Sequence, residues 1–262
     1  MHSCNIMAEI RFMTGEPALL AGSTLIIADL HLGIEREFFQ SGIKLPSQTE
    51  RMTGRIESLI EAAGAERLVI LGDLKHKVPG ISIQEIREVP EFLSRLSGRL
   101  KVDIVMGNHD AGIEAFAPKG VSVHPVTGFR LDDMFLSHGH AWPGKESMSC
   151  GHIIIGHQHP MIEFRDRLGY RFREPVWARG EFSRDKLAGK YGKLPGKLPE
   201  LIVMPAFSAL SGGAAINRKL DREAEHNFLG PVMKAACEKG MRVFLLDGTY
   251  LGTLSDMKKH DA

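Results

Sequence analysis

The sequence is poor in cysteine, balanced in charge and free of long apolar runs. Its three cysteines, Cys4, Cys150 and Cys237, show no CxxC spacing, which argues against a disulfide framework and a thiolate zinc site. The net charge of the 262 residues is +1, so no overall field indicates a nucleic-acid or membrane partner. No stretch approaches the roughly 18 apolar residues of a membrane helix, and we find no signal peptide. We expect a reduced, soluble, cytoplasmic protein.

Histidine, by contrast, occurs 12 times, and seven of these residues fall in five short motifs. The motifs read D-L-H at 29–31, G-D-L-K-H at 72–76, G-N-H-D at 107–110, S-H-G-H at 137–140 and G-H-Q-H at 156–159. A single DxH or HxH is more often structural than functional. All five in this order argue against coincidence and indicate one shared site.

Each motif follows an apolar run, and all of these runs except the one before S-H-G-H are rich in β-branched residues. Continuous apolar runs of this length are typical of strands that are buried on both faces. The runs are Leu25–Ala28, Leu68–Leu71, Val102–Met106, Met134–Leu136 and Ile153–Ile155. Because ligands collect beyond the carboxyl ends of strands in α/β sheets, the pattern predicts that the motifs converge there.

Two amphipathic patterns between these strands predict helices. The first spans Ser47–Ala63, with Ser47 as the expected N-cap. The second spans Ile83–Leu96, where Pro90 should kink or split the helix. After about residue 120 the pattern becomes strand-rich, with short pieces at Val121–Val123, Gly128–Leu131 and Arg242–Leu246. We predict an α/β fold of two packed mixed β-sheets flanked by helices, a four-layer αββα sandwich.

No repeat or linker divides the chain, so we predict one domain over residues 1–262 with a basic insertion at about 165–197. The insertion holds ten Lys or Arg against four Asp or Glu. Its aromatic residues are Tyr170, Phe172, Trp177, Phe182 and Tyr191. Phosphate contacts dominate nucleic-acid affinity and aromatic rings stack on bases, so one interpretation is a nucleic-acid surface. The other, a solvated insertion or oligomer contact, is favoured because the overall charge is near zero.

The motifs combine carboxylate oxygen, imidazole nitrogen and amide oxygen, which suit Mn, Fe, Zn, Ni or Co. Two ligands one residue apart do not share a face of a regular strand, but they converge where a strand ends and the chain turns. Gly72 and Gly156 are expected to give the backbone that freedom. The sequence therefore predicts a divalent metal site.

The motif series resembles the calcineurin-like metallophosphoesterase superfamily, whose pattern is DxH, GDxx[DH], GNH[DE], a lone His and GHxH. The resemblance covers roughly residues 24–160, and every motif is intact. The sequences around two of the motifs, IADLHLGIE and IIIGHQHP, are similar to those of the ICC-like, SbcD-related subgroup. Members of that subgroup are often encoded near DNA ligase or helicase genes. The fold and activity of that superfamily are the expectations for this chain.

The resemblance implies two divalent ions, with Mn²⁺ as first choice. The first would be held by Asp29, His31, Asp73 and His159, and the second by Asp73, Asn108, His138 and His157. A hydroxide between the metals would attack phosphorus in line. His109 would protonate the leaving oxygen, and Asp110 would orient His109.

Four further residues stand near the motifs with less definite roles. His76 is expected in the substrate pocket or behind a ligand rather than on a metal. His138 is preferred over His140 because the family ligand usually precedes Gly, but an exchange of the two stays open. Arg36 and Lys75 either meet phosphate oxygens or are solvated surface charges, and the second interpretation is favoured.

The function predicted is a metal-dependent phosphoesterase acting on a small phosphate ester, with a phosphodiester favoured. A DNA nuclease is one alternative. A non-catalytic, metal-bound interaction scaffold is another, although such a protein would be expected to lack a ligand or His109. The physiological substrate and the oligomeric state stay open.

Overall fold

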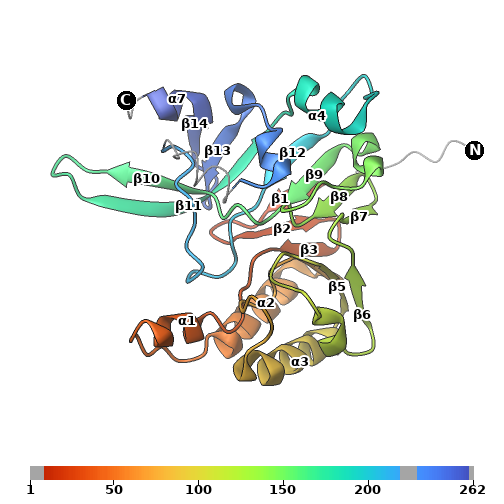
Figure 1. Cartoon of the computed structure of the whole chain (residues 1–262), viewed down its shortest axis with the longest axis vertical. Helices are drawn as coiled ribbons and strands as arrows, with labels where there is room; N and C mark the ends of the chain where they lie inside the picture. The colour runs from red at the N-terminus through yellow and green to blue at the C-terminus, as the bar shows by residue number, and fades with distance from the viewer. Residues whose placement is uncertain (1–8, 219–228, 260–262) are drawn as a thin grey trace, which may run out of the picture.

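The structure is a computed structural model that describes residues 9–218 and 229–259. The first of its two sheets has the order β1-β2-β3-β4-β5-β6 (Figure 1). Its strands are β1 (Ile10–Phe12), β2 (Ala18–Ala21), β3 (Thr24–Ile27), β4 (Arg67–Leu71), β5 (Lys101–Val105) and β6 (Val121–His124). Strands β3 to β6 pair in parallel, so their carboxyl ends lie at one edge.

The second sheet has the order β14-β13-β11-β12-β9-β8-β7, and β10 pairs with β11. Its strands are β7 (Phe129–Leu131), β8 (Met134–Ser137), β9 (His152–Ile155), β10 (Met161–Arg165), β11 (Arg171–Gly180), β12 (Glu200–Val203), β13 (Arg242–Leu245) and β14 (Tyr250–Thr253). Strands β8, β9 and β12 are parallel. Both sheets are therefore mixed, and each contributes parallel strands to the site.

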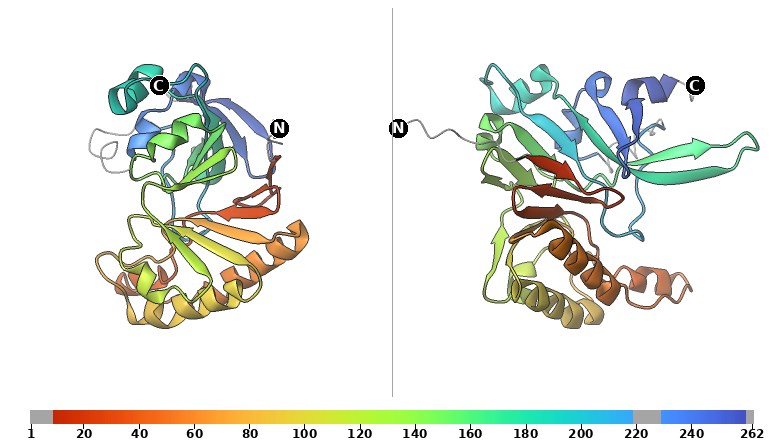
Figure 2. Two further views of the ribbon diagram at one scale, coloured as in Figure 1. Left: turned by 90° about the vertical axis from the view of Figure 1, so that its right-hand side faces the viewer. Right: turned by 180° about the vertical axis from the view of Figure 1, so that it is seen from behind.

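Helices cover the outer face of each sheet (Figure 2). The helices are α1 (Glu35–Gln40), α2 (Thr49–Ala63), α3 (Ile83–Ser97), α4 (Arg184–Tyr191), α6 (Pro231–Lys234) and α7 (Leu254–Lys259). Short 3-10 turns are η1 (Ile113–Phe116), η2 (Lys145–Ser149) and η3 (Glu238–Gly240). With α2 and α3 on one side and α4, α6 and α7 on the other, the predicted four-layer αββα sandwich is confirmed.

Strand β4 explains why the predicted strands are continuous apolar runs. Leu68 and Ile70 pack outward with the helices, whereas Val69 and Leu71 pack between the two sheets. All four side chains are fully buried. Because successive side chains point to opposite faces of a strand, both faces need an apolar residue when both are covered.

The structure corrects two local predictions about the helices, the N-cap of α2 and the splitting of α3. The N-cap position of α2 is Gln48, while the Ser47 hydroxyl accepts from the backbone N–H of Thr49 at 3.3 Å and donates to Glu88 at 2.9 Å. Helix α3 runs through Pro90 as one element and begins with a capping box between Ser82 and Glu85. A proline inside a helix costs about 3 kcal/mol, and the buried apolar face of α3 offsets that cost.

Residues 165–197 are more regular than the sequence suggests. They contain α4 and the whole of β11, which lies between β12 and β13 inside the second sheet. The β10–β11 hairpin projects from the body to the same side as α1, in Figure 1 and in the right-hand view of Figure 2. Cys150 and Cys237 are free thiols, and Cys4 lies outside the described residues. No helix in the described ranges is long and apolar enough to cross a bilayer.

Candidate metal centre

The predicted ligands come together from both sheets, just beyond the carboxyl ends of five strands. They are Asp29 and His31 after β3, Asp73 after β4, Asn108 after β5, His138 after β8, and His157 and His159 after β9. Asp29, Asp73 and His138 are almost completely removed from solvent, while His157 and His159 are partly exposed. Charged groups are rarely buried unless they are paired or bind metal, and the two carboxylates pair with histidines of the same cluster.

Backbone strain is concentrated on these residues. Six non-glycine residues in the described ranges have positive φ, and five of them are proposed ligands. Their φ angles are 58° at Asp29, 49° at His31, 49° at Asp73, 67° at His157 and 39° at His159. The left-handed region costs roughly 1–2 kcal/mol for an ordinary residue and persists where the surroundings enforce it. These turns let both side chains of DxH and of HxH point to the same side.

The motif glycines leave room for the ligands. A Cβ on Gly72 would clash with the His138 ring, and one on Gly107 would clash with the Asp73 carboxylate. A Cβ on Gly156 would lie 2.6 Å from Oδ2 of Asp29. Gly72 has the expected positive φ of 77°, whereas Gly156 is not among the positive-φ glycines. Close approach, rather than conformational freedom, therefore explains Gly156.

Asp29, His31 and His159 form the first of two adjoining groups. One ligand atom from each lies within 4.8 Å of the others. Nε2 of His159 is 3.2 Å from Oδ1 of Asp29 and 3.4 Å from Nε2 of His31. Oδ2 of Asp73 lies 3.7 Å from Nε2 of His31. The ligand atoms of Asp29, His31 and His159 and one carboxylate oxygen of Asp73 therefore lie around one position.

Asp73, His138 and His157 form the second group within the same 4.8 Å limit. Nε2 of His138 lies 3.2 Å from Oδ1 of Asn108 and 3.3 Å from Oδ1 of Asp73. The two carboxylate oxygens of Asp73 thus face different groups. This arrangement suits a carboxylate shared by two cations.

Hydrogen bonds fix the orientation of the donors. Nδ1 of His138 donates to the Leu71 carbonyl at 2.7 Å, which directs Nε2 toward Asp73. The backbone N–H of His157 donates to Oδ2 of Asp29 at 2.9 Å. Such outer contacts hold metal-binding side chains in position and select the tautomer.

Burial and charge set the protonation states of the cluster. Burial lowers the pKa of His31 to about 3 and that of His157 to about 4. Burial acts against ionisation of Asp73, but the His138 charge and hydrogen bond lower the pKa of that carboxyl overall. Burial also opposes protonation of His138, whereas Asp73 raises its pKa to about 9. In the absence of metal the carboxylates are thus ionised and His31 and His157 are neutral, whereas His138 keeps a proton that a bound metal would displace.

A comparison with solved structures matches this geometry to a known fold. Over 93% of its length, the chain aligns with all of the Pseudomonas putida nuclease MPE chain, with 20% sequence identity and a TM-score of 0.54. The chain has the metallophosphoesterase fold. A second match, to Yfce, a phosphoesterase from E. coli, covers 55% of this chain and 73% of that one, with 21% identity and a TM-score of 0.35. No family model and no curated protein matches the sequence.

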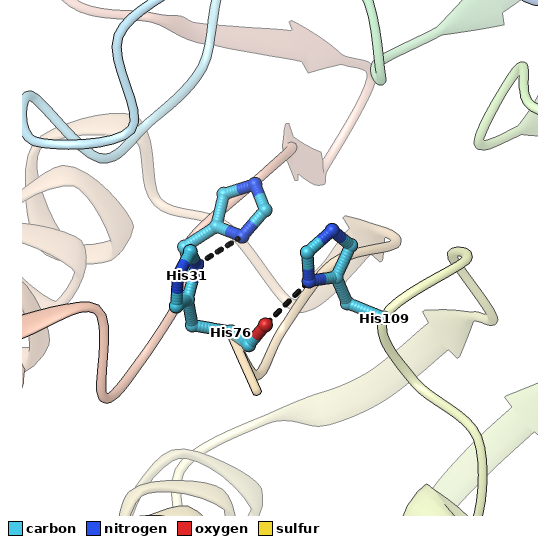
Figure 3. Close-up of side chains that lie close together, drawn as sticks. All are labelled: His31, His76 and His109. Carbon is cyan, nitrogen blue, oxygen red and sulfur yellow. Dashed lines mark hydrogen bonds between the residues drawn. The ribbon is translucent and has the colours of Figure 1, made fainter. Parts of the chain in front are cut away.

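Within this metallophosphoesterase fold, His109 and His76 lie next to the first group (Figure 3). Nδ1 of His109 donates to the His76 carbonyl at 2.5 Å, and its Nε2 lies 3.9 Å from Oδ2 of Asp73. Nδ1 of His76 lies 3.3 Å from Nδ1 of His31, and Nε2 of His76 lies 2.5 Å from Oε2 of Glu37. His31, His76 and His109 form a third group of donors within 4.8 Å.

Asp110 does not orient the His109 ring as expected. Its fully buried carboxylate accepts hydrogen bonds from the backbone N–H of Gly107 and Leu74, both at 2.9 Å, and of Lys75 at 3.3 Å. Burial raises the pKa of Asp110 to about 6. Asp110 therefore ties the two loops that follow β4 and β5, while the His76 carbonyl orients His109.

Three other candidates are also located. His140 packs against His138 and His157, with ring centroids 5.1 and 5.9 Å away, but belongs to none of the three donor groups. Lys75 is 1% exposed and donates to the carbonyls of Lys77 and Gly80, so neither interpretation of it was correct. Arg36 is exposed and lines a cavity beside His109.

Proposed function

We propose that the protein is a metal-dependent phosphoesterase with two divalent cations, for which Mn²⁺ is the first choice. The observation that carries the proposal is the left-handed backbone of five donor residues that belong to two different sheets. Strain of this kind clusters at functional sites because packing alone does not reward it. The first cation would be held by Asp29, His31, Asp73 and His159, and the second by Asp73, Asn108, His138 and His157.

Bound divalent cations lower the pKa of a water molecule and neutralise charge on the phosphate during an in-line displacement. The protein's part is to hold the donors rigidly. Asp73 directs one oxygen to each group, which fixes the spacing of the two positions. The mixture of imidazole, carboxylate and amide donors favours Mn, Fe, Zn, Ni or Co over Ca. A phosphodiester is the favoured substrate.

His109 is proposed to protonate the leaving oxygen. Its Nδ1–H is committed to the His76 carbonyl, so the ring is fixed with Nε2 facing the donors. A general acid must lie within hydrogen-bond reach of the oxygen that it protonates. A phosphate ester bound at the two metal positions would meet that condition at Nε2 of His109.

The proposal is tested on protein stripped with a chelator and then dialysed. We expect no hydrolysis of bis(nitrophenyl) phosphate by the stripped protein, and recovery when Mn²⁺ is added, with two ions bound per chain by elemental analysis. A panel of Fe²⁺, Co²⁺, Ni²⁺ and Zn²⁺ identifies the preferred ion. Full activity in excess chelator would contradict the proposal.

A nuclease is the second candidate, and the β10–β11 hairpin favours it. The hairpin begins two residues after His159 and ends in exposed residues, with Leu168 95% and Tyr170 68% exposed. Phe172 stacks on Phe164, with centroids 5.2 Å apart, and Tyr170 continues the stack at 6.5 Å. Cationic, aromatic-lined surfaces of this kind bind single-stranded nucleic acid.

Charge on the hairpin points the same way. Arg171 and Arg173 on the hairpin both pair with the one carboxylate of Glu163, so two cations share a single negative charge. The solved nuclease that shares the fold adds support for a nucleic-acid substrate. The hairpin would then contact a nucleic-acid strand that extends away from the metal positions.

A double substitution of Arg165 and Arg167 with Gln tests this candidate without breaking the Glu163 pairs. We expect weaker binding of single-stranded DNA, with the log–log salt slope lowered by roughly 0.7 for each phosphate that the variant no longer neutralises. Lys145→Gln/Lys239→Gln, with the same change in charge away from the hairpin, is the control. If neither single-stranded nor duplex DNA binds at low salt, the nuclease candidate fails and the small-ester activity stands alone.

A further inference from the structure

A cavity of about 230 Å³ opens beside the proposed metal positions. His109 and His76 form its inner wall. Its outer walls come from α1, from the loop after His76 and from the start of α3, and they include Arg36, Glu37, Lys77 and Ser82. The cavity is smaller than the roughly 300–1,000 Å³ of pockets that hold drug-sized ligands. It has room for part of a substrate, about the size of one sugar.

The outer wall is positively charged. Arg36 and Lys77 are exposed, and neither side chain has a hydrogen-bond or ion-pair partner within residues 9–218 and 229–259. The one carboxylate of the wall, Glu37, is occupied by Nε2 of His76 at 2.5 Å. The cavity therefore presents two cations to whatever enters it, which favours an anionic ligand.

The position of His109 says which part of a substrate enters. If His109 protonates the leaving oxygen, that oxygen must lie within reach of Nε2. His109 also forms a wall of the cavity. The remainder of the leaving alcohol is therefore directed into the cavity and toward Arg36 and Lys77.

We infer that this cavity binds the leaving alcohol and that Arg36 and Lys77 recognise a phosphate carried on it. The substrate class is then a phosphodiester whose leaving group bears a second phosphate. This inference rests on the proposed phosphoesterase activity and narrows its substrate. Arg36 contributes a planar, multi-donor guanidinium and Lys77 a point charge, a combination suited to phosphate oxygens.

The test compares three thymidine dinucleotides in the presence of the activating metal: one with only the bridging phosphate, one with an added 5′-phosphate and one with an added 3′-phosphate. We expect kcat/KM to be at least about tenfold higher for one of the doubly phosphorylated forms, mainly through KM. The variant Arg36→Gln/Lys77→Gln should lose most of that preference. The variant Lys44→Gln/Arg51→Gln, which removes one exposed Lys and one exposed Arg outside the cavity, should keep it.

A binding measurement separates this inference from the proposed activity. Thymidine 3′,5′-bisphosphate, titrated into metal-free protein, should bind about tenfold more weakly to Arg36→Gln/Lys77→Gln than to the control variant. Hydrolysis of all three dinucleotides at equal rates would overturn the inference and leave the phosphoesterase intact. Equal binding of the bisphosphate by both variants would overturn it even if no ester were hydrolysed. If no metal supports hydrolysis but the bisphosphate still binds more weakly to Arg36→Gln/Lys77→Gln than to the control variant, the proposed activity is rejected and phosphate binding by the cavity stands.

Discussion

Two buried aspartates near the first sheet differ both in their charged partners and in their backbone conformation. Asp103 lies within the regular strand β5, where it accepts from Nε of Arg67 at 2.8 Å and pairs with Nε2 of His124 at 2.6 Å. Asp73 lies one residue beyond Gly72 at the end of β4 with a φ of 49°. Both residues are at most 2% exposed.

The difference lies in how each negative charge is neutralised. Asp103 has a permanent cation, Arg67, in its own sheet and needs no unusual backbone. Among the described residues, the ion-pair partners of Asp73 and Asp29 are all histidines, and burial keeps His31 in the neutral form by lowering its pKa. A strained cluster with two carboxylates and no permanent cation is suited to metal ions, whereas an unstrained and fully paired cluster is structural.

The largest effect is expected from replacing Asp73 with Asn. Loss of the shared carboxylate should lower metal occupancy at both positions and reduce ester hydrolysis by more than about 10⁴-fold, because bound metals supply several kcal/mol of transition-state stabilisation. Elemental analysis and hydrolysis of a nitrophenyl diester provide the two readouts. The matched control is Asp103→Asn, which should retain both metals. Unaltered metal content in Asp73→Asn would remove the distinction between the two clusters.

His109→Asn should give the next largest loss, and the loss should depend on the ester. General acid catalysis is worth about 10²–10⁴-fold, or roughly 3–5 kcal/mol, for an alkoxide leaving group. A nitrophenolate needs little help, so its rate should fall much less. His109 is not among the proposed ligands, and both metals should stay bound. Equal losses on alkyl and nitrophenyl esters, with metals retained, would rule out the proton-donor role.

A smaller effect is expected at His76. Nε2 of His76 faces Glu37, and Nδ1 of His76 faces Nδ1 of His31. This Glu37–His76–His31 series of hydrogen bonds leaves Nε2 of His31 free to bind a metal. Groups behind a metal ligand typically contribute 10–100-fold in affinity. His76→Phe should weaken the first metal by about that factor and the second by less, as measured by calorimetry. His152→Phe, at the opposite end of β9, is the control, and equal weakening in both variants would exclude this role.

Much of this comparison was predictable from the sequence. The buried parallel strands produce apolar runs. Asp29 follows its run directly, and Asp73 and His157 follow theirs after a single glycine, so both the layers and the location of the donors could be predicted. The role of each donor stays a prediction. Asp103 gave no signal, since one charged residue in an apolar run does not reveal its partners on neighbouring strands.

Residues that act on backbone groups were the least predictable. Asp110 and Lys75 lie inside motifs, yet their side chains bind backbone groups of neighbouring loops. Strand β11 was missed for another reason. It carries Arg, Glu and Pro in its exposed half, and only Val176 to Ala178 have the consecutive buried side chains of a central strand.

The smallest effect concerns the stability of the structural cluster. Asp103→Asn should lower the free energy of unfolding by about 1–3 kcal/mol at neutral pH, the usual cost of weakening a buried hydrogen bond to a charged group. Burial opposes ionisation of Asp103, but the hydrogen bonds from His124 and Arg67 lower the pKa of its carboxyl overall. The ionised form is therefore favoured by folding. Its stabilisation is fully present above the unfolded pKa of about 3.9 and is lost as the pH falls through the lower folded value.

Urea unfolding of metal-free protein at pH 7, 5 and 3 measures this dependence. The difference in free energy of unfolding between wild type and Asp103→Asn should be constant from pH 7 to 5. It should narrow at pH 3, because the Asp103 carboxyl of the unfolded wild-type chain takes up a proton there. Asp185→Asn, in the first turn of α4, changes the same functional group on the outside of the second sheet and is the control. A difference in free energy of unfolding that is unchanged at pH 3 would show that Asp103 stabilises the fold through its shape rather than through its charge. The contrast with Asp73 would then rest on backbone strain alone.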